Sequence, residues 1–157
     1  MLEIERKFLV SSTAYRDAAR SRTEIVQGFL CTDPERTIRV RRSGDRAWIT
    51  IKGRTRDSGT TRPEWEYPIP VAEAEELLGL CPEPPIRKVR YEVAEGAHLF
   101  EVDEFLEANL GLTLAEVELE DVSEAFPRPD WLGEEVTGNP AYYNSQLSIK
   151  PFGTWND

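Results

Sequence analysis

The chain has 157 residues, of which 31% are charged and 39% hydrophobic, and its net charge is −10 at pH 7. This length suits one domain, residues 1–157, whose core needs no support from disulfides or structural zinc. The negative charge argues against nucleic acid and membranes as partners, because both bind basic surfaces. No apolar stretch reaches the roughly 20 residues that cross a bilayer. The N-terminus lacks a signal-peptide pattern, so we expect a cytoplasmic protein.

The cysteines and the histidine offer little for metal or nucleophilic chemistry. Cys31 and Cys81 lie far apart in the sequence, and His98 is the only histidine. A zinc site needs four Cys, His or acidic ligands, and a catalytic triad needs a histidine or an equivalent base. We therefore expect neither kind of site.

Short strands dominate the predicted secondary structure. Alternation of apolar and polar residues between turn residues predicts eight strands, at 2–10, 24–32, 37–42, 47–52, 64–69, 86–93, 99–105 and 113–119. The first four are expected to form a meander. Three helices are predicted: a short one after an N-cap at residues 11–13, an amphipathic one at 71–80 and a final one at 139–149. Residues 53–62 predict a mobile loop.

Together these elements predict a mainly β (α+β) fold. Eight strands of mainly antiparallel type, with few helices, imply a closed β-barrel with short outer helices. The barrel is expected over about residues 1–121, and a C-terminal segment with its helix over about residues 122–157.

Charged residues recur two apart in most of the predicted strands, and most of these strands carry one sign. Residues at i and i+2 share one face of a strand, so the sheet has one densely ionised face. The acidic residues of this face are Glu3, Glu5, Glu64, Glu66, Glu101, Asp103, Glu116, Glu118 and Glu120, and the basic ones are Lys7, Arg39, Arg41, Lys52, Lys88 and Arg90.

Two interpretations of the ionised face are open. A half-buried antiparallel sheet whose charged residues face water would show the same alternation. Segregated signs favour a charged lumen instead, because solvated strands more often mix signs in cross-strand pairs. Arginine suits bidentate phosphate contacts, and carboxylate oxygens suit Mg²⁺ or Mn²⁺. These are the components of metal-assisted phosphoryl transfer on a small polyanionic substrate.

The sequence Glu3-Ile4-Glu5-Arg6-Lys7 resembles the ExExK signature of the CYTH superfamily, the triphosphate tunnel metalloenzymes. The signature is followed, in the order of the family, by R-V-R, I-K-G, E-W-E, K-V-R, E-V-D and E-V-E. The resemblance therefore spans about residues 1–120. It implies an eight-stranded antiparallel barrel that encloses a polar, charged tunnel.

The resemblance also implies a role for each matching position. The ligands of the catalytic divalent metal, Mg²⁺ or Mn²⁺, would be Glu3, Glu5, Glu116 and Glu118, which with Lys7 form the catalytic set. The triphosphate oxygens would contact Lys7, Arg39, Arg41, Lys52, Lys88 and Arg90. A second metal or the attacking water would be positioned by Glu64, Glu66, Glu101 and Asp103. Glu120 is expected beyond the barrel rim, in solvent.

Two segments are similar to the small bacterial inorganic tripolyphosphatase group. They are Val26-Gln27-Gly28-Phe29-Leu30, with Phe29 in place of a tyrosine, and the tail over residues 136–144. This similarity implies metal-dependent hydrolysis of tripolyphosphate to pyrophosphate and phosphate, by in-line attack of water. Alternatives are a class IV-type adenylyl cyclase, an organic (thiamine or nucleoside) triphosphatase, and a non-catalytic polyphosphate or nucleotide sensor. The aromatic residues Trp48, Trp65 and Tyr67 are expected on the outer face. The sequence leaves open a homodimer, and a C-terminal helix that gates the tunnel.

Overall fold

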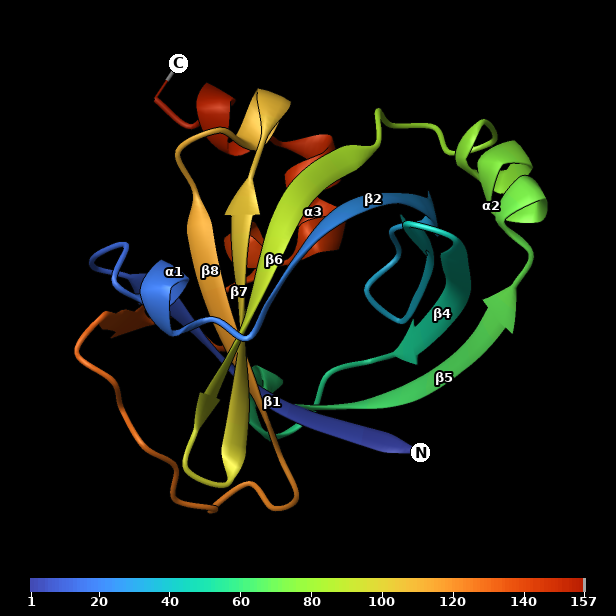
Figure 1. Ribbon diagram of the computed structural model, residues 1–157. Helices are drawn as coiled ribbons and strands as arrows, with labels where there is room; N and C mark the ends of the chain where they lie inside the picture. Colours follow the sequence, from blue (N-terminus) through green and yellow to red (C-terminus); the bar gives the residue numbers. More distant parts are fainter. Residues whose placement is uncertain (157) are drawn as a thin grey trace.

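Nine antiparallel strands form one sheet in the computed structural model, which describes residues 1–156 (Figure 1). The strands are β1 (Leu2–Val10), β2 (Ser21–Cys31), β3 (Arg36–Ser43), β4 (Arg46–Gly53), β5 (Thr61–Ile69), β6 (Ile86–Glu95), β7 (His98–Phe105), β8 (Thr113–Leu119) and β9 (Leu132–Glu135). Eight of them close a barrel in the order β5-β4-β3-β2-β6-β7-β8-β1, because β1 pairs with both β8 and β5. The predicted closed antiparallel barrel is confirmed.

The strand order differs from the prediction at both ends of the chain. Strands β2 to β5 are consecutive neighbours, but β1 lies between β8 and β5, so the predicted meander is wrong for the first strand. Alternation shows that a segment is a strand, but it does not show which distant strand lies beside it in the sheet. The prediction also missed β9, since Leu-Gly-Glu-Glu is too short to show alternation.

The helices are short. The α-helices are α1 (Tyr15–Ala18), α2 (Val71–Leu78) and α3 (Asn144–Ile149), and the 3₁₀ helices are η1 (Asp57–Gly59), η2 (Glu107–Asn109), η3 (Pro140–Tyr142) and η4 (Phe152–Thr154). Tyr143 is extended (φ −68°, ψ 134°) and divides the predicted final helix into η3 and α3. The predicted N-cap before α1 is wrong, because Ala14 precedes the helix and makes no side-chain cap. No helix within residues 1–156 is long and apolar enough to cross a membrane.

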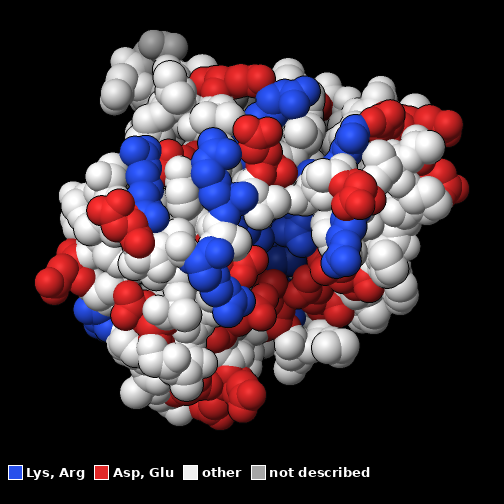
Figure 2. Space-filling model, viewed as in Figure 1, with Lys and Arg blue, Asp and Glu red and all other residues white. Residues whose placement is uncertain are grey.

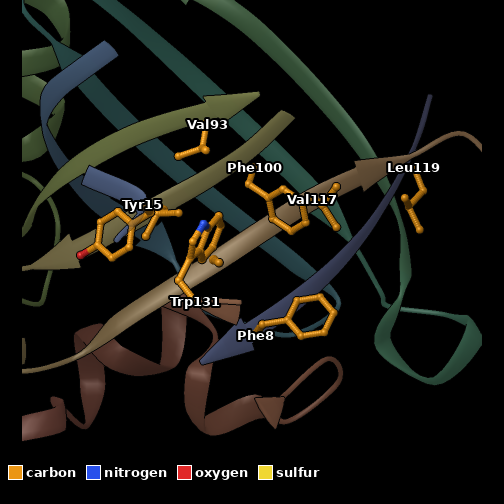
Figure 3. Close-up of a cluster of buried hydrophobic side chains, with 9 residues drawn as sticks. Phe8, Tyr15, Val93, Phe100, Val117, Leu119 and Trp131 are labelled. Atoms are coloured by element: carbon orange, nitrogen blue, oxygen red, sulfur yellow. The ribbon is translucent and has the colours of Figure 1, made fainter. Parts of the chain in front are cut away.

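Apolar residues cover the outside of the barrel. Figure 3 shows one cluster, in which side chains of β1, β6, β7 and β8 meet Tyr15 of α1 and Trp131. The Trp131 ring packs edge to face against Phe100, with centroids 5.4 Å apart. A second cluster lies between α2 and the strands β3 and β4, and Figure 1 shows α1 and α2 outside the barrel wall. The apolar side of the alternation therefore faces these coverings, and the ionised side faces the lumen.

The lumen face changes from charged to apolar toward one end of the barrel. Phe29, Ile86, Phe105 and Leu114 each stand two residues from a polar lumen residue, yet they belong to a buried apolar cluster. Leu147 of α3 is fully buried in the same cluster. The C-terminal helix thus packs into this end of the barrel.

Candidate active site

A cavity inside the barrel collects charged side chains from strands all around its wall. Figure 2 shows basic side chains deep in this hollow and acidic side chains along one edge of it. The charged residues that line the cavity are Glu5, Lys7, Arg39, Lys52, Arg62, Lys88, Arg90 and Glu116. Hydroxyl and amide groups from Thr37, Thr50, Thr55, Thr60, Thr137, Tyr143, Asn144 and Ser145 complete its lining. Such a wall of donors suits an anion rich in oxygen.

Arg41 is the one predicted phosphate-binding residue that is absent from this lining. Its guanidinium carbon lies 5.5 Å from the centre of the Trp48 ring, to which it is directly paired across β3 and β4. Burial, followed by the charges of Arg39 and Arg90, lowers the pKa of Arg41 to about 10. The expectation that Trp48 faces outward is wrong. Trp48 and Lys52 are four residues apart on β4, so both side chains lie on the lumen face. Trp65 and Tyr67 alternate with the lumen residues Glu64 and Glu66 on β5, and they are exposed on the outer face.

Most lumen bases are paired with carboxylates. The nitrogen–oxygen distances are 2.6 Å for Lys52–Glu3, 3.4 Å for Lys7–Glu116, 2.8 Å for Lys88–Asp103, 2.9 Å for Arg90–Glu101, 2.8 Å for Arg90–Asp103, 3.6 Å for Arg39–Glu66 and 3.8 Å for Arg41–Glu66. Signs separate along strands, as predicted, but opposite signs meet between strands. The acidic and basic residues of the lumen are therefore joined by ion pairs instead of forming two separate groups.

Carboxylates also oppose carboxylates on β7, β8 and β1. Glu101 is directly paired with Glu116, and Glu118 with Glu5. Like charges in such pairs destabilise a sheet. Burial, followed by the charges of Glu116 and Glu3, raises the pKa of Glu5 well above its ordinary value. Burial is also the first cause of the raised pKa of Glu101.

Other lumen carboxylates are held ionised by their basic partners. Burial disfavours the charge on Glu116, but Lys7 and other lumen cations lower its pKa to about 2. Burial likewise opposes the charge on Glu3, and the ion pair with Lys52 outweighs it and lowers the pKa. Glu64 differs, because burial and a hydrogen bond with Glu3 raise its pKa to about 7.

The carboxylates fit a hard divalent cation by their chemistry. They supply only oxygen donors, the type that Mg²⁺ and Mn²⁺ prefer, and a cation would relieve the opposition of Glu5 to its acidic neighbours. Within residues 1–156, no three acidic, cysteine or histidine side chains converge as a metal site. Lysines occupy the carboxylates instead, since Glu3 contacts Lys52 and Glu116 contacts Lys7.

The family model of the CYTH domain matches residues 1–148. The chain belongs to the CYTH family. The resemblance seen in the sequence motifs is thereby confirmed. A protein of Acetivibrio thermocellus named inorganic triphosphatase is 44% identical over 156 residues, which cover 99% of this chain and 98% of that protein. Another of that name, from Nitrosomonas europaea, is 36% identical over 154 residues, with 95% and 98% covered.

A solved structure described as an inorganic triphosphatase has the same fold. It superposes with a TM-score of 0.66 at 34% identity, and the match covers 94% of each chain. The barrel of this CYTH chain, with its charged lumen, is therefore the barrel of the family.

Arg62 is a lumen residue of this CYTH barrel that our sequence analysis missed. Nη2 of Arg62 donates to Oγ1 of Thr37 at 3.3 Å, and Nε donates to the carbonyl oxygen of Gly53 at 3.4 Å. Among the described residues, no carboxylate lies within ion-pair distance of this guanidinium. Burial is the first cause of its lowered pKa. A signal was present, because Arg62 has the parity of Glu64 and Glu66, but it was assigned to the preceding loop.

The C-terminal segment of the CYTH chain also supplies lumen residues that the motifs do not contain. Nζ of Lys7 donates to the carbonyl oxygen of Tyr142 at 3.2 Å and lies 5.6 Å from the centre of the Tyr143 ring. Oγ1 of Thr137 accepts from the backbone N–H of Lys7 at 2.9 Å. Glu120 is exposed past the end of β8, as expected.

Proposed function

We propose that this CYTH protein is a divalent-metal-dependent triphosphatase that hydrolyses inorganic tripolyphosphate to pyrophosphate and phosphate. One observation carries the proposal: two lysines expected to bind the substrate, Lys7 and Lys52, contact Glu116 and Glu3, two of the four carboxylates expected to bind metal. A cation and a polyphosphate that arrive together would exchange these partners, the carboxylates passing to the cation and the lysines to the phosphate. The name of the two relatives, inorganic triphosphatase, supports the same substrate.

The residues that would hold the cation are Glu3, Glu5, Glu116 and Glu118. When bound, a divalent cation supplies Lewis-acid chemistry and neutralises phosphate charge. The bases that line the cavity would orient the chain of phosphates and stabilise the negative charge that spreads over its oxygens in an in-line displacement. Glu64, which is hydrogen-bonded with the expected metal ligand Glu3, would position the attacking water beside the cation.

The remaining acidic residues would act around this centre. Glu101 and Glu66 lie against the lumen arginines and could position water or a second cation. Asp103 is saturated by Lys88 and Arg90, so a role in holding these bases fits it better than metal binding. No side-chain nucleophile is needed.

Product analysis tests the proposal. Tripolyphosphate, ATP and thiamine triphosphate are incubated with the protein in Mg²⁺, in Mn²⁺ and in EDTA, and phosphate, pyrophosphate and cyclic AMP are measured. We expect metal-dependent release of phosphate and pyrophosphate from tripolyphosphate, faster than any release from the organic triphosphates. Cyclic AMP with pyrophosphate from ATP would indicate a cyclase. Tight binding of tripolyphosphate without any metal-dependent turnover would indicate a sensor and overturn the enzymatic proposal.

Arg62→Ala is expected to raise the KM for tripolyphosphate about tenfold to a hundredfold, the range for a lost hydrogen bond to a charged group. The free energy of unfolding should fall much less than in a variant that breaks a buried ion pair, because no carboxylate lies within ion-pair distance of the guanidinium. Steady-state kinetics and urea unfolding measure both effects. Arg54→Ala is the control, since the Arg54 side chain is 79% exposed on the loop that precedes β5. An unchanged KM in Arg62→Ala would exclude a phosphate contact.

A further inference from the structure

Lys88 is the most enclosed base of the lumen, with 1% of its surface exposed. Its Nζ donates to Oδ2 of Asp103 at 2.8 Å and to Oδ1 of Asn144 at 3.0 Å. A lysine ammonium carries three protons and accepts none. Two of them are therefore committed to these oxygens, and the tetrahedral nitrogen fixes the direction of the third. Because Lys88 lines the cavity, this third proton is the one available to a ligand there.

Asn144 has a defined orientation. Its Oδ1 also accepts from Nε2 of Gln27 at 2.5 Å. Because an ammonium only donates, the amide oxygen of Asn144, and not its nitrogen, must face Lys88. The amide of Gln27 is then oriented in turn, and its side chain is fully buried. The contacts form a chain from Gln27 through Asn144 to Lys88.

The position of Asn144 is set by the packing of α3. Asn144 is the first residue of this helix, and Leu147, one turn later, is fully buried in the apolar cluster at the end of the barrel. The preceding Tyr142 presents its carbonyl oxygen to Lys7. The C-terminal segment thus touches two of the lumen lysines through uncharged oxygens.

We propose that Asn144 is a positioning residue for the reaction: it holds Lys88 so that the free N–H of the ammonium points at an oxygen of the bound triphosphate. Asn144 adds no charge to the site. The inference rests on the proposed function, since it takes the cavity ligand to be a triphosphate. Removal of one hydrogen bond to a charged group predicts a fall in kcat/KM of roughly tenfold to a hundredfold for Asn144→Ala.

A double-mutant cycle tests this role, with wild type, Asn144→Ala, Lys88→Ala and the double variant. The measured quantities are kcat/KM for tripolyphosphate with Mg²⁺ and the dissociation constant of tripolyphosphate in EDTA by calorimetry. If Asn144 acts through Lys88, its removal has no further effect once Lys88 is absent. Ser148→Ala is the matched control. The Ser148 hydroxyl donates to the carbonyl of Ser145 within α3 and is absent from the cavity lining, so this variant should behave as wild type.

Two results would overturn the positioning role: an Asn144→Ala variant as active as wild type, or an equal loss of kcat/KM with and without Lys88. The second would mean that Asn144 acts independently of Lys88, through the fold or through its own contact with the ligand. A wild type that neither binds nor hydrolyses tripolyphosphate would instead refute the proposed function. Crystal structures of wild type and Asn144→Ala test separately whether Asn144 holds Lys88. An unmoved Lys88 ammonium would refute that hold and with it the positioning role, whatever the ligand, and a displaced one would uphold the hold.

Discussion

Glu5→Gln is expected to stop turnover and, without metal, to stabilise the protein at neutral pH. Mutating a residue that only hydrogen-bonds a metal ligand typically lowers metal affinity or activity about 10- to 100-fold. Loss of a ligand itself should therefore lower kcat by more than about a hundredfold. The free energy of unfolding should rise, because Glu5 is directly opposite Glu118 across β1 and β8 and lies near Glu3 and Glu116. Glutamine keeps the shape of the side chain and removes this repulsion.

The stabilising effect of Glu5→Gln should depend on pH, because only the ionised form of Glu5 destabilises the fold. Folding raises the pKa of Glu5, so the folded state holds the proton of this carboxyl more tightly than the unfolded state. The penalty of an ionised Glu5 is therefore absent below the unfolded pKa of about 4.3. It grows as the pH rises toward the folded pKa and is constant above that value. Each unit of the pKa difference is worth about 1.4 kcal/mol.

Urea unfolding in EDTA, at intervals from pH 4 to pH 8, measures this difference between Glu5→Gln and wild type. We expect equal free energies of unfolding near pH 4 and a variant that is increasingly more stable as the pH rises. Glu24→Gln is the control, because the Glu24 side chain is 78% exposed on the outer side of β2. A variant that is less stable than wild type at pH 7, or one that retains normal turnover, would contradict the assigned role of Glu5.

The strands and the two faces of the sheet could be predicted from the sequence because both depend on local alternation. Alternation placed Arg39, Lys52, Lys88 and Arg90 on one face of the sheet, and the family resemblance implied that this face is the lumen, where they line one cavity. The same alternation includes Arg62, which was missed only because the strand was predicted to begin at residue 64, three residues after its start at Thr61. The error for Trp48 arose differently. A general expectation that aromatic residues lie on the outer face was preferred to the alternation of side chains along the strand, which places Trp48 on the same face as Lys52.

Contacts between distant segments could not be predicted in this way. Nothing local to residues 2–10 shows that β1 closes the barrel against β8 and β5. The same holds for Asn144, which is 56 residues from Lys88 in the sequence and carries no charge to mark it. The pairing of Lys52 with Glu3 likewise depends on the three-dimensional closure of the barrel, and it makes the charged residues of the lumen one interlocked network.

Arg90→Met is expected to cost more stability than any exchange of a surface charge. Nε and Nη2 of Arg90 donate to the two carboxylate oxygens of Asp103 at 2.8 Å and 2.9 Å, and Nη1 donates to Glu101 at 2.9 Å. Asp103 is 2% exposed, and Arg90 and Lys88 keep its pKa below the ordinary range against the effect of burial. Breaking a buried pair by removing one partner costs about 3–5 kcal/mol.

The double variant Arg90→Met, Asp103→Asn distinguishes support of the fold from binding of substrate. Removing both charges together should restore most of the lost free energy of unfolding, because no carboxylate remains buried without its arginine. Activity should stay low in both variants, since the guanidinium that lines the cavity is gone. Urea unfolding and tripolyphosphate hydrolysis measure the two effects. Arg20→Ala, which breaks the exposed pair of Arg20 with Glu92, should cost at most about 1 kcal/mol.

The combination of results decides what the Arg90–Asp103 pair does. Recovered stability with lost activity would show that the ion pair with Asp103 positions the Arg90 guanidinium for contact with the substrate. Recovery of both would show that Arg90 serves Asp103 and the fold, and would remove it from the phosphate-binding set. If Arg90→Met alone is as stable as wild type, the buried pair contributes nothing to stability, and the low pKa of Asp103 must then depend on Lys88.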